Sequence, residues 1–128
     1  MKILLDTHVL IWLALDMLPP KAEKLIIDES NSIYFSTASI WEIVIKRNSD
    51  RIDFNVDPSI IYNSLLENDY NEIVINSKHS IAIGTLPMHH KDPFDRILLA
   101  QSIVENMSLL TADKKMAQYP ASIILISK

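Results

Sequence analysis

With 128 residues, 48% of them hydrophobic, the chain is long enough for one domain with a real core and short for two. It has no cysteine, which excludes disulfides and thiolate metal sites, and its formal net charge of -4 argues against a protein that simply coats nucleic acid. The longest uninterrupted apolar run, residues 9–15, is far below a membrane span, and Asp6 comes too early for a secretory signal, so we expect a cytoplasmic protein.

The first half of the chain alternates short apolar runs with helical patterns. Residues 2–5 are expected to form a strand that stops at Asp6, and residues 8–15 form a largely buried helix. Pro20 can open the next helix, through about Ser30, because proline is tolerated in the first helical turn. The remaining elements expected here are a strand over 33–36, a helix over 37–47 and a polar loop over 48–56.

The second half continues the alternation. Asp57 is a good N-cap and Pro58 fits the first helical position, so a helix is expected to about Asn68. The later elements are a strand over 72–75, a helix over 77–83, a loop over 85–94, a helix over 95–106, a strand over 108–111, a short helix from Asp113 and a strand over 123–126. Short, wholly apolar strands separated by helices are typical of a parallel sheet covered on both faces. We therefore predict one α/β domain over 1–128, a three-layer α/β/α sandwich with a mainly parallel sheet of about five strands.

Four acidic residues stand where this fold brings its strand ends together. Crossover helices place the C-terminal ends of parallel strands at one edge of the sheet, where ligands bind. Asp6 follows the first strand, and Asp113 lies two residues past the strand that ends at Thr111. Glu42 lies in the first turns of the helix after the second strand, and Asp95 opens a helix that can face the same edge.

Each of these acids also has a purely structural explanation. Asp6, Asp95 and Asp113 occupy positions at which aspartate can cap a helix, and Ser39 with Glu42 fits a capping box. Glu42 favours a functional explanation, because apolar residues surround it on almost every side of its helix. A buried carboxylate is costly unless it is paired or coordinated, and Asp6 beside a buried strand meets the same cost.

A cation would relieve the repulsion among four carboxylates at one edge. At an effective dielectric constant of about 20, two like charges about 4 Å apart repel by on the order of 4 kcal/mol, so either protons or a divalent cation must neutralise them. Because the ligands would all be hard oxygens, Mg²⁺ or Mn²⁺ is favoured over Zn²⁺. Such an ion can generate hydroxide and neutralise charge on a phosphate, which makes metal-assisted phosphodiester hydrolysis the expected reaction.

Four segments together resemble one known family. They are ILLDTHVLIW at 3–12, STASIWEI at 36–43, DPFDRILLAQ at 92–101 and LLTADKKM at 109–116. In this order and at this spacing they resemble the PIN domain, specifically the single-domain VapC-type toxins of bacterial toxin–antitoxin pairs. The resemblance implies a Rossmann-like fold, metal-dependent ribonuclease activity on RNA, a homodimer and inhibition by a small antitoxin.

The resemblance also implies roles for individual residues. The family's first to fourth acids match Asp6, Glu42, Asp95 and Asp113, as catalytic groups and metal ligands, with Asp113 able to act through a water. Asp92 is an alternative to Asp95, but the third acid of the family begins the apolar helix, which favours Asp95.

Nearby basic and polar residues complete the expected site. Lys46, Arg96 and Lys114 are candidates for holding the phosphate backbone, and Thr7 and Ser36 for holding waters beside the metal ligands.

Three histidines and three aromatic residues have structural explanations that we favour over functional ones. His8 is expected to start a helix or join the core, and His89 and His90 to lie in a solvated loop. Trp12, Trp41 and Phe94 are expected in the core or a dimer surface.

Two other functions remain open. One is a catalytically silent binding module, in which the acids only cap helices. The other is a receiver-type signalling module, which needs an acidic pair after the first strand and a phospho-acceptor aspartate after the third. Here the first strand ends in Asp6-Thr7-His8 and the third in Ile75-Asn76, which disfavours it.

Overall fold

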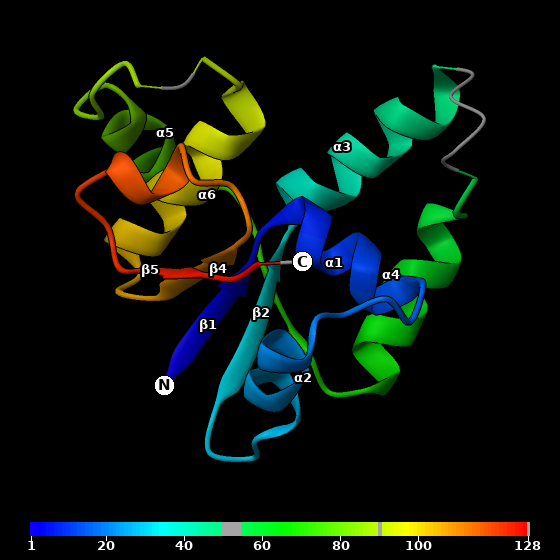
Figure 1. Cartoon of the computed structure of the whole chain (residues 1–128). Coiled ribbons are helices and arrows are strands. Elements are labelled where there is room, and N and C mark those ends of the chain that lie inside the picture. Colours follow the sequence, from blue (N-terminus) through cyan, green and yellow to red (C-terminus); the bar gives the residue numbers. More distant parts are fainter. Residues whose placement is uncertain (50–54, 90, 128) are drawn as a thin grey trace.

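The computed structural model describes residues 1–49, 55–89 and 91–127, which form five strands and six α-helices (Figure 1). Their bounds are β1 (Lys2–Leu5), α1 (Thr7–Ala14), α2 (Pro20–Ile27), β2 (Ser32–Ser36), α3 (Thr37–Asn48), α4 (Pro58–Glu67), β3 (Asn71–Ile73), α5 (Ser77–Ile83), α6 (Pro93–Val104), β4 (Ser108–Thr111) and β5 (Ile123–Leu125), with a short 3-10 helix, η1 (Met116–Gln118), before β5. The predicted alternation of strands and helices is confirmed. Part of the loop predicted over 48–56 lies outside the described residues.

The strands form one sheet in the order β3-β2-β1-β4-β5, and every neighbouring pair is parallel. From β1 the chain moves outward to β2 and β3, and then crosses to the other side of β1 to add β4 and β5. The strand order therefore reverses between β1 and β4, and a ligand crevice is expected beyond their C-terminal ends. A receiver-type module would have the order 2-1-3-4-5, so this topology excludes that alternative.

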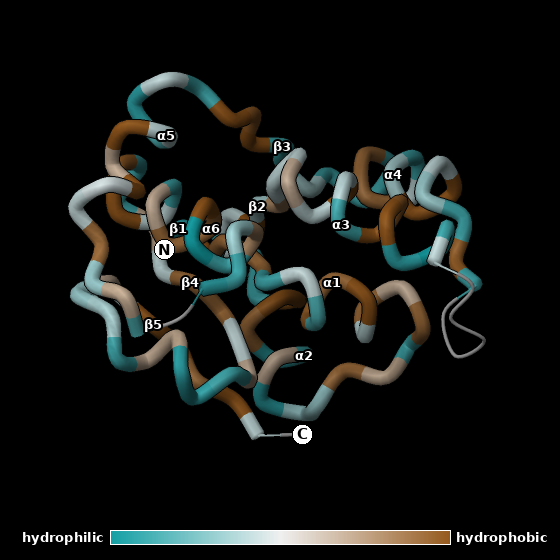
Figure 2. The backbone as a smooth tube through the Cα atoms, turned by 90° about the horizontal axis from the view of Figure 1, so that it is seen from above, coloured by the Kyte–Doolittle hydropathy of each residue, from teal (hydrophilic) through white to brown (hydrophobic). Residues whose placement is uncertain are grey.

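Alternating side chains of β1 divide the core into two parts. Ile3 and Leu5 pack with residues of α1, α2 and α4, whereas Leu4 packs with Leu98 and Leu99 of α6. Figure 2 shows α5 and α6 on one side of the strands and α1, α2 and α4 on the other. Successive side chains of a strand point to opposite faces, so wholly apolar strands require helices on both sides. The predicted three-layer α/β/α architecture is confirmed.

The helix that follows β2 is less buried than its sequence predicts. Trp41 is 60% exposed and Ile45 44% exposed, although both flank residues of the core on the same helix. Ile43 and Glu42 are buried, with Glu42 8% exposed. The apolar residues of α3 therefore cover two sides of the helix, one in the core and one in contact with solvent, and Glu42 is on the buried side.

Within the described residues, no helix has the length and apolar character needed to cross a membrane.

Candidate functional site

Asp6 stands at the switch in strand order. Its backbone N–H donates to the Leu110 carbonyl at 3.0 Å, which joins the end of β1 to β4. Its side chain is 2% exposed, and Oδ2 accepts a 2.7 Å hydrogen bond from the Thr111 hydroxyl. Oδ1 is buried without a hydrogen-bond partner among the described residues. Asp6 occupies the N-cap position of α1 but its side chain makes no capping hydrogen bond, so capping does not explain this carboxylate.

One hydroxyl connects Asp6 to the segment that follows β4. Besides donating to Asp6, Thr111 Oγ1 accepts a hydrogen bond from the Asp113 backbone N–H at 3.0 Å. The Asp113 Oδ1 atom accepts from the Lys115 N–H at 2.9 Å and so shapes the turn that precedes η1. The short helix predicted from Asp113 is therefore a turn, followed by a 3-10 helix that begins at Met116.

Glu42 lies in the second turn of α3, and its two carboxylate oxygens have different surroundings. Oε2 is 3.5 Å from the Lys46 ammonium, one helical turn further on. Oε1 is buried and has no hydrogen-bond partner in the described part of the chain. An ion pair therefore compensates only part of the burial cost of this carboxylate.

The capping box considered for Ser39 and Glu42 does not form. Helix α3 begins at Thr37, as predicted, and the Ser36 hydroxyl caps it by accepting from the Ala38 N–H at 3.0 Å. Ser39 lies inside the helix, where its Oγ accepts a 2.9 Å hydrogen bond from the Thr7 hydroxyl. This buried contact joins the start of α1 to α3, so Thr7 helps to hold Asp6 and Glu42 in fixed relative positions.

The first turn of α6 distinguishes two neighbouring aspartates. Asp92 is the N-cap, and its Oδ1 accepts from the backbone N–H groups of Phe94 at 2.9 Å and Asp95 at 3.3 Å. The helix begins at Pro93, two residues before the predicted start, because Asp92 supplies the capping oxygen. The capping role considered for Asp95 therefore belongs to Asp92.

The pKa of Asp95 indicates that acidic side chains from distant segments lie close to it. The pKa of Asp95 is raised from 3.8 to about 8, mainly by burial and to a smaller extent by the charges of Asp6, Asp92, Glu42 and Asp113. Since such charge interactions weaken with distance, side chains from four separate segments must share one region. Burial also raises the pKa of Asp6, while the Thr111 hydrogen bond opposes that increase.

The arrangement fits a divalent cation chemically, although its side chains are not already placed around one. Among the described residues, no three acidic or histidine side chains form a group that could hold a metal ion together. The buried oxygens Asp6 Oδ1 and Glu42 Oε1 have no hydrogen-bond partner there, and Asp95 retains a proton near neutral pH. Carboxylate oxygens with unmet demand for positive charge are suitable ligands for Mg²⁺ or Mn²⁺ once side chains rotate.

Arg96 has structural contacts that the sequence did not predict, and its phosphate contact stays a prediction. Its guanidinium donates to the carbonyls of Pro87 at 2.9 Å and Ile83 at 3.2 Å, and to the Tyr119 hydroxyl at 3.4 Å. It therefore anchors the connection between α5 and α6. Lys114 is exposed in the turn after Asp113, and its phosphate contact remains a prediction.

Among the histidines singled out in the sequence that the structure describes, only His8 is shown to lie near the site. His8 is exposed at the start of α1, and its charge lowers the pKa of Asp6, which places it near that carboxylate. The ring of His89 meets the ring of Tyr119 edge-on, with centroids 5.3 Å apart. His90 lies outside the described residues.

Sequence reasoning missed the buried hydroxyls of Thr111 and Ser39. Thr111 carried one usable signal, because it is a polar residue ending an otherwise apolar strand two positions before Asp113. Its contact with Asp6 spans 105 residues, and no local pattern contains that information.

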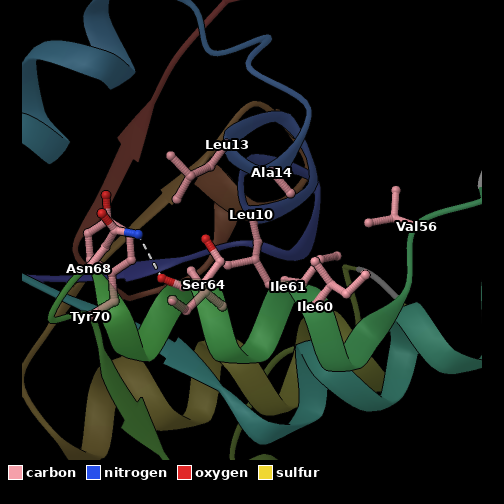
Figure 3. A pocket seen from close by; sticks show the side chains of 10 residues that line it. Leu10, Leu13, Ala14, Val56, Ile60, Ile61, Ser64, Asn68 and Tyr70 are labelled. Atoms are coloured by element: carbon pink, nitrogen blue, oxygen red, sulfur yellow. Dashed lines mark hydrogen bonds between the residues drawn. The ribbon is translucent and has the colours of Figure 1, made fainter.

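A separate apolar pocket lies between α1 and α4 (Figure 3). Its volume is about 290 Å³, and Leu10, Leu13, Ile60 and Ile61 are among its lining residues. Ile60 is 68% exposed, so a large apolar side chain at this pocket faces solvent.

Comparisons with known proteins agree with this architecture. A model of the PIN domain matches residues 3–121. The structure of VapBC2 from Rickettsia felis bound to a promoter DNA fragment is similar with a TM-score of 0.74, 17% identity and coverage of 99% of this chain and 98% of that chain. VapBC-5 from Mycobacterium tuberculosis, of the VapBC family of toxin-antitoxin systems, is similar with a TM-score of 0.66 and 15% identity, and the match covers 99% of this chain and 98% of that chain. A toxin-antitoxin complex from Klebsiella pneumoniae has a TM-score of 0.65 and 19% identity, and the match covers 98% of each chain. A search of curated proteins found no match.

Proposed function

The chain belongs to the PIN domain family, and on that premise we propose that it is a divalent-metal-dependent endoribonuclease acting as the toxin of a toxin–antitoxin pair. The observation that supports this most directly is that Asp6 Oδ1 and Glu42 Oε1 are buried carboxylate oxygens without a hydrogen-bond partner among the described residues. Burial and the charges of neighbouring acids also raise the pKa of Asp95 to about 8. A site that concentrates this much negative charge at a strand-order switch suits a cation and a phosphate group.

In the proposed site, Asp6, Glu42 and Asp95 hold Mg²⁺ or Mn²⁺, and Asp113 completes the ligands directly or through a water. When bound, the ion supplies charge neutralisation at the scissile phosphate and a water of lowered pKa. Asp95 would have to release its proton to solvent in order to act as a ligand, and Thr111 keeps Asp6 Oδ2 oriented. The exposed ammonium of Lys114, beside Asp113, pairs with the RNA backbone.

The test removes one charge at a time without changing side-chain shape. Asp6→Asn and Asp95→Asn should abolish RNA cleavage and toxicity, because each removes a proposed ligand, while circular dichroism shows an intact fold. Asp69→Asn is the matched control: Asp69 precedes β3 at the opposite end of the sheet, and its φ of 62° is one that asparagine adopts readily. Full cleavage by both site variants, or by the wild type in excess chelator, contradicts the proposal.

A metal titration distinguishes the proposed enzyme from a catalytically silent binding module. An enzyme of the proposed kind should show a rising thermal midpoint as Mn²⁺ is added, since a ligand bound only to the folded state stabilises it. An unchanged midpoint, together with no cleavage, favours the silent module.

The proposed protein partner is a small antitoxin, because the similar solved structures include VapBC2 from Rickettsia felis and a toxin-antitoxin complex from Klebsiella pneumoniae. We place its apolar side chains in the pocket between α1 and α4, because Leu13 and Ile60 there leave apolar surface unfilled by the chain itself. Ile60→Glu should abolish neutralisation by the product of a short adjacent reading frame while leaving RNA cleavage intact. Unimpaired neutralisation by this variant rejects that location.

The proposed assembly is a homodimer formed through α3. Most of the first helix contributes to the core, since Val9, Leu10 and Ile11 are buried. Trp41 and Ile45 lie on one exposed side of α3, and Trp41 stacks edge-on against Phe94, with ring centroids 5.0 Å apart. A second copy of the chain would cover this apolar surface.

A further inference from the structure

The ion pair between Glu42 and Lys46 differs from an ordinary surface pair. The Lys46 ammonium lies 3.5 Å from Glu42 Oε2, and the two side chains are 20% and 10% exposed. The next residue of the helix, Arg47, pairs with Asp57 at the N-cap of α4 at the same 3.5 Å separation, but both of those side chains are 40% exposed. Water therefore screens the Glu42–Lys46 attraction less than the adjacent one.

Lys46 supplies the positive charge that Glu42 has beside it in the metal-free protein. Glu42 is buried, its Oε1 atom has no hydrogen-bond partner in the described part of the chain, and Lys46 provides a positive charge at Oε2. A divalent cation at Glu42 would bring like charge next to the ammonium, so the pair and the metal-bound state oppose each other. The ammonium is on a flexible four-carbon stem and can move away toward solvent.

We propose that Lys46 is the resident counter-ion of Glu42 and that a divalent cation must displace it, so that competition with Lys46 sets the metal affinity of the site. The inference rests on the proposed function. In the metal-free protein Lys46 compensates a buried carboxylate and stabilises the fold. On metal binding the same contact is lost, which lowers the affinity for the ion. Removing the ammonium should therefore weaken the metal-free protein and strengthen metal binding.

Mn²⁺ binding, measured by isothermal titration calorimetry, gives the first test. Lys46→Met keeps most of the aliphatic stem and removes the charge, and it should bind Mn²⁺ about two- to tenfold more tightly than the wild type. Lys46→Arg retains a cation beside Glu42 and should stay near the wild-type affinity. Arg47→Met removes one positive charge from the adjacent position, and it should change the affinity less than Lys46→Met.

Metal-free thermal unfolding gives the second test. Lys46→Met should lower the thermal unfolding midpoint in the wild-type background. The effect should be smaller in a Glu42→Gln background, because residue 42 then carries no negative charge for Lys46 to pair with. This coupling separates a contact with Glu42 from the general electrostatic field of the protein. If Lys46→Met does not fold, Lys46→Gln replaces it in both measurements.

The outcomes of these experiments distinguish a failure of the Lys46 inference from a failure of the proposed function. Unchanged or weaker Mn²⁺ binding by the Lys46 variant overturns the inference, as does equal tightening by Arg47→Met. An equal loss of midpoint in the Glu42→Gln background also overturns it. If the wild type binds no Mn²⁺ at all, the proposed function fails with it. Normal wild-type binding that is lost in Asp6→Asn supports that function whatever Lys46→Met does.

Discussion

At the residue scale, the hydroxyl of Thr111 adds a side-chain contact to the backbone hydrogen bond between the ends of β1 and β4. It donates to Asp6 Oδ2 and accepts from the Asp113 N–H, and its side chain is fully buried. A buried group of this kind serves two polar partners that water cannot reach, so its loss leaves both unsatisfied.

We predict that Thr111→Val lowers the free energy of unfolding by about 1–3 kcal/mol and reduces RNA cleavage, because valine has a similar shape but no hydroxyl. Urea unfolding and a cleavage assay measure the two effects. Thr111→Ser keeps the hydroxyl and should retain most of the activity. Wild-type cleavage by the valine variant would show that the orientation of Asp6 does not depend on this bond.

The raised pKa of Asp95 makes the stability of the metal-free protein depend on pH. Its ordinary value of 3.8 holds in the unfolded chain, and the folded value is about 8. Between these values the folded protein holds a proton that the unfolded chain has lost, so raising the pH favours unfolding. The increased pKa of Asp6 acts in the same direction.

The free energy of unfolding should therefore fall as the pH rises from about 4 to about 8 and level off above that. Asp95→Asn should reduce this slope and be more stable than the wild type at pH 8 by roughly 1–2 kcal/mol, a discounted figure because water partly screens the side chain. Chemical denaturation across the pH range in chelator provides the measurement. An identical slope in the variant would mean that Asp95 ionises normally in the folded state.

At the element scale, Arg96 binds the α5–α6 connection to the first turn of α6. Its planar guanidinium reaches carbonyls that a single ammonium could not satisfy together. Arg96→Lys should consequently lower the free energy of unfolding by about 1–2 kcal/mol. The exposed Lys114 serves as the control: Lys114→Met should weaken RNA binding with little change in stability. Thermal melting and RNA titration distinguish the two roles, and a fully stable Arg96→Lys would contradict the anchoring role.

At the scale of the whole molecule, the two sides of α3 have separate tasks. One side carries Glu42 into the site, and the other presents Trp41 and Ile45 to solvent. A dimer through α3 would therefore fix the helix that carries a proposed metal ligand.

Trp41→Glu should convert a dimer into a monomer, because it places a charge in the centre of the proposed apolar contact. Light scattering after gel filtration measures the mass. Ile27→Glu, a change at a 68% exposed apolar residue on α2, should leave the mass unchanged. A monomeric wild type, or a dimeric Trp41 variant, rules out this interface.

The elements themselves were predictable because their signals are local. Apolar runs of four or five residues, separated by helical patterns and by Pro20, Pro58 and Asp57 at helix starts, specify parallel strands covered on both faces. The parallel arrangement then carries Asp6 and Asp113 to one edge without further information. Element boundaries shifted where a capping side chain intervened, as Asp92 did for α6.

The sequence by itself determined the α/β class and the gathering of acids at the strand ends, since both follow from periodicity and chain direction. Only the tertiary structure decided the partners of those acids, Thr111 for Asp6 and Lys46 for Glu42, and the backbone carbonyls that the Arg96 guanidinium contacts. The physical reason is that a side-chain contact depends on which faces of distant elements meet. Burial, which raises the pKa of Asp95, likewise arises only when those elements pack together.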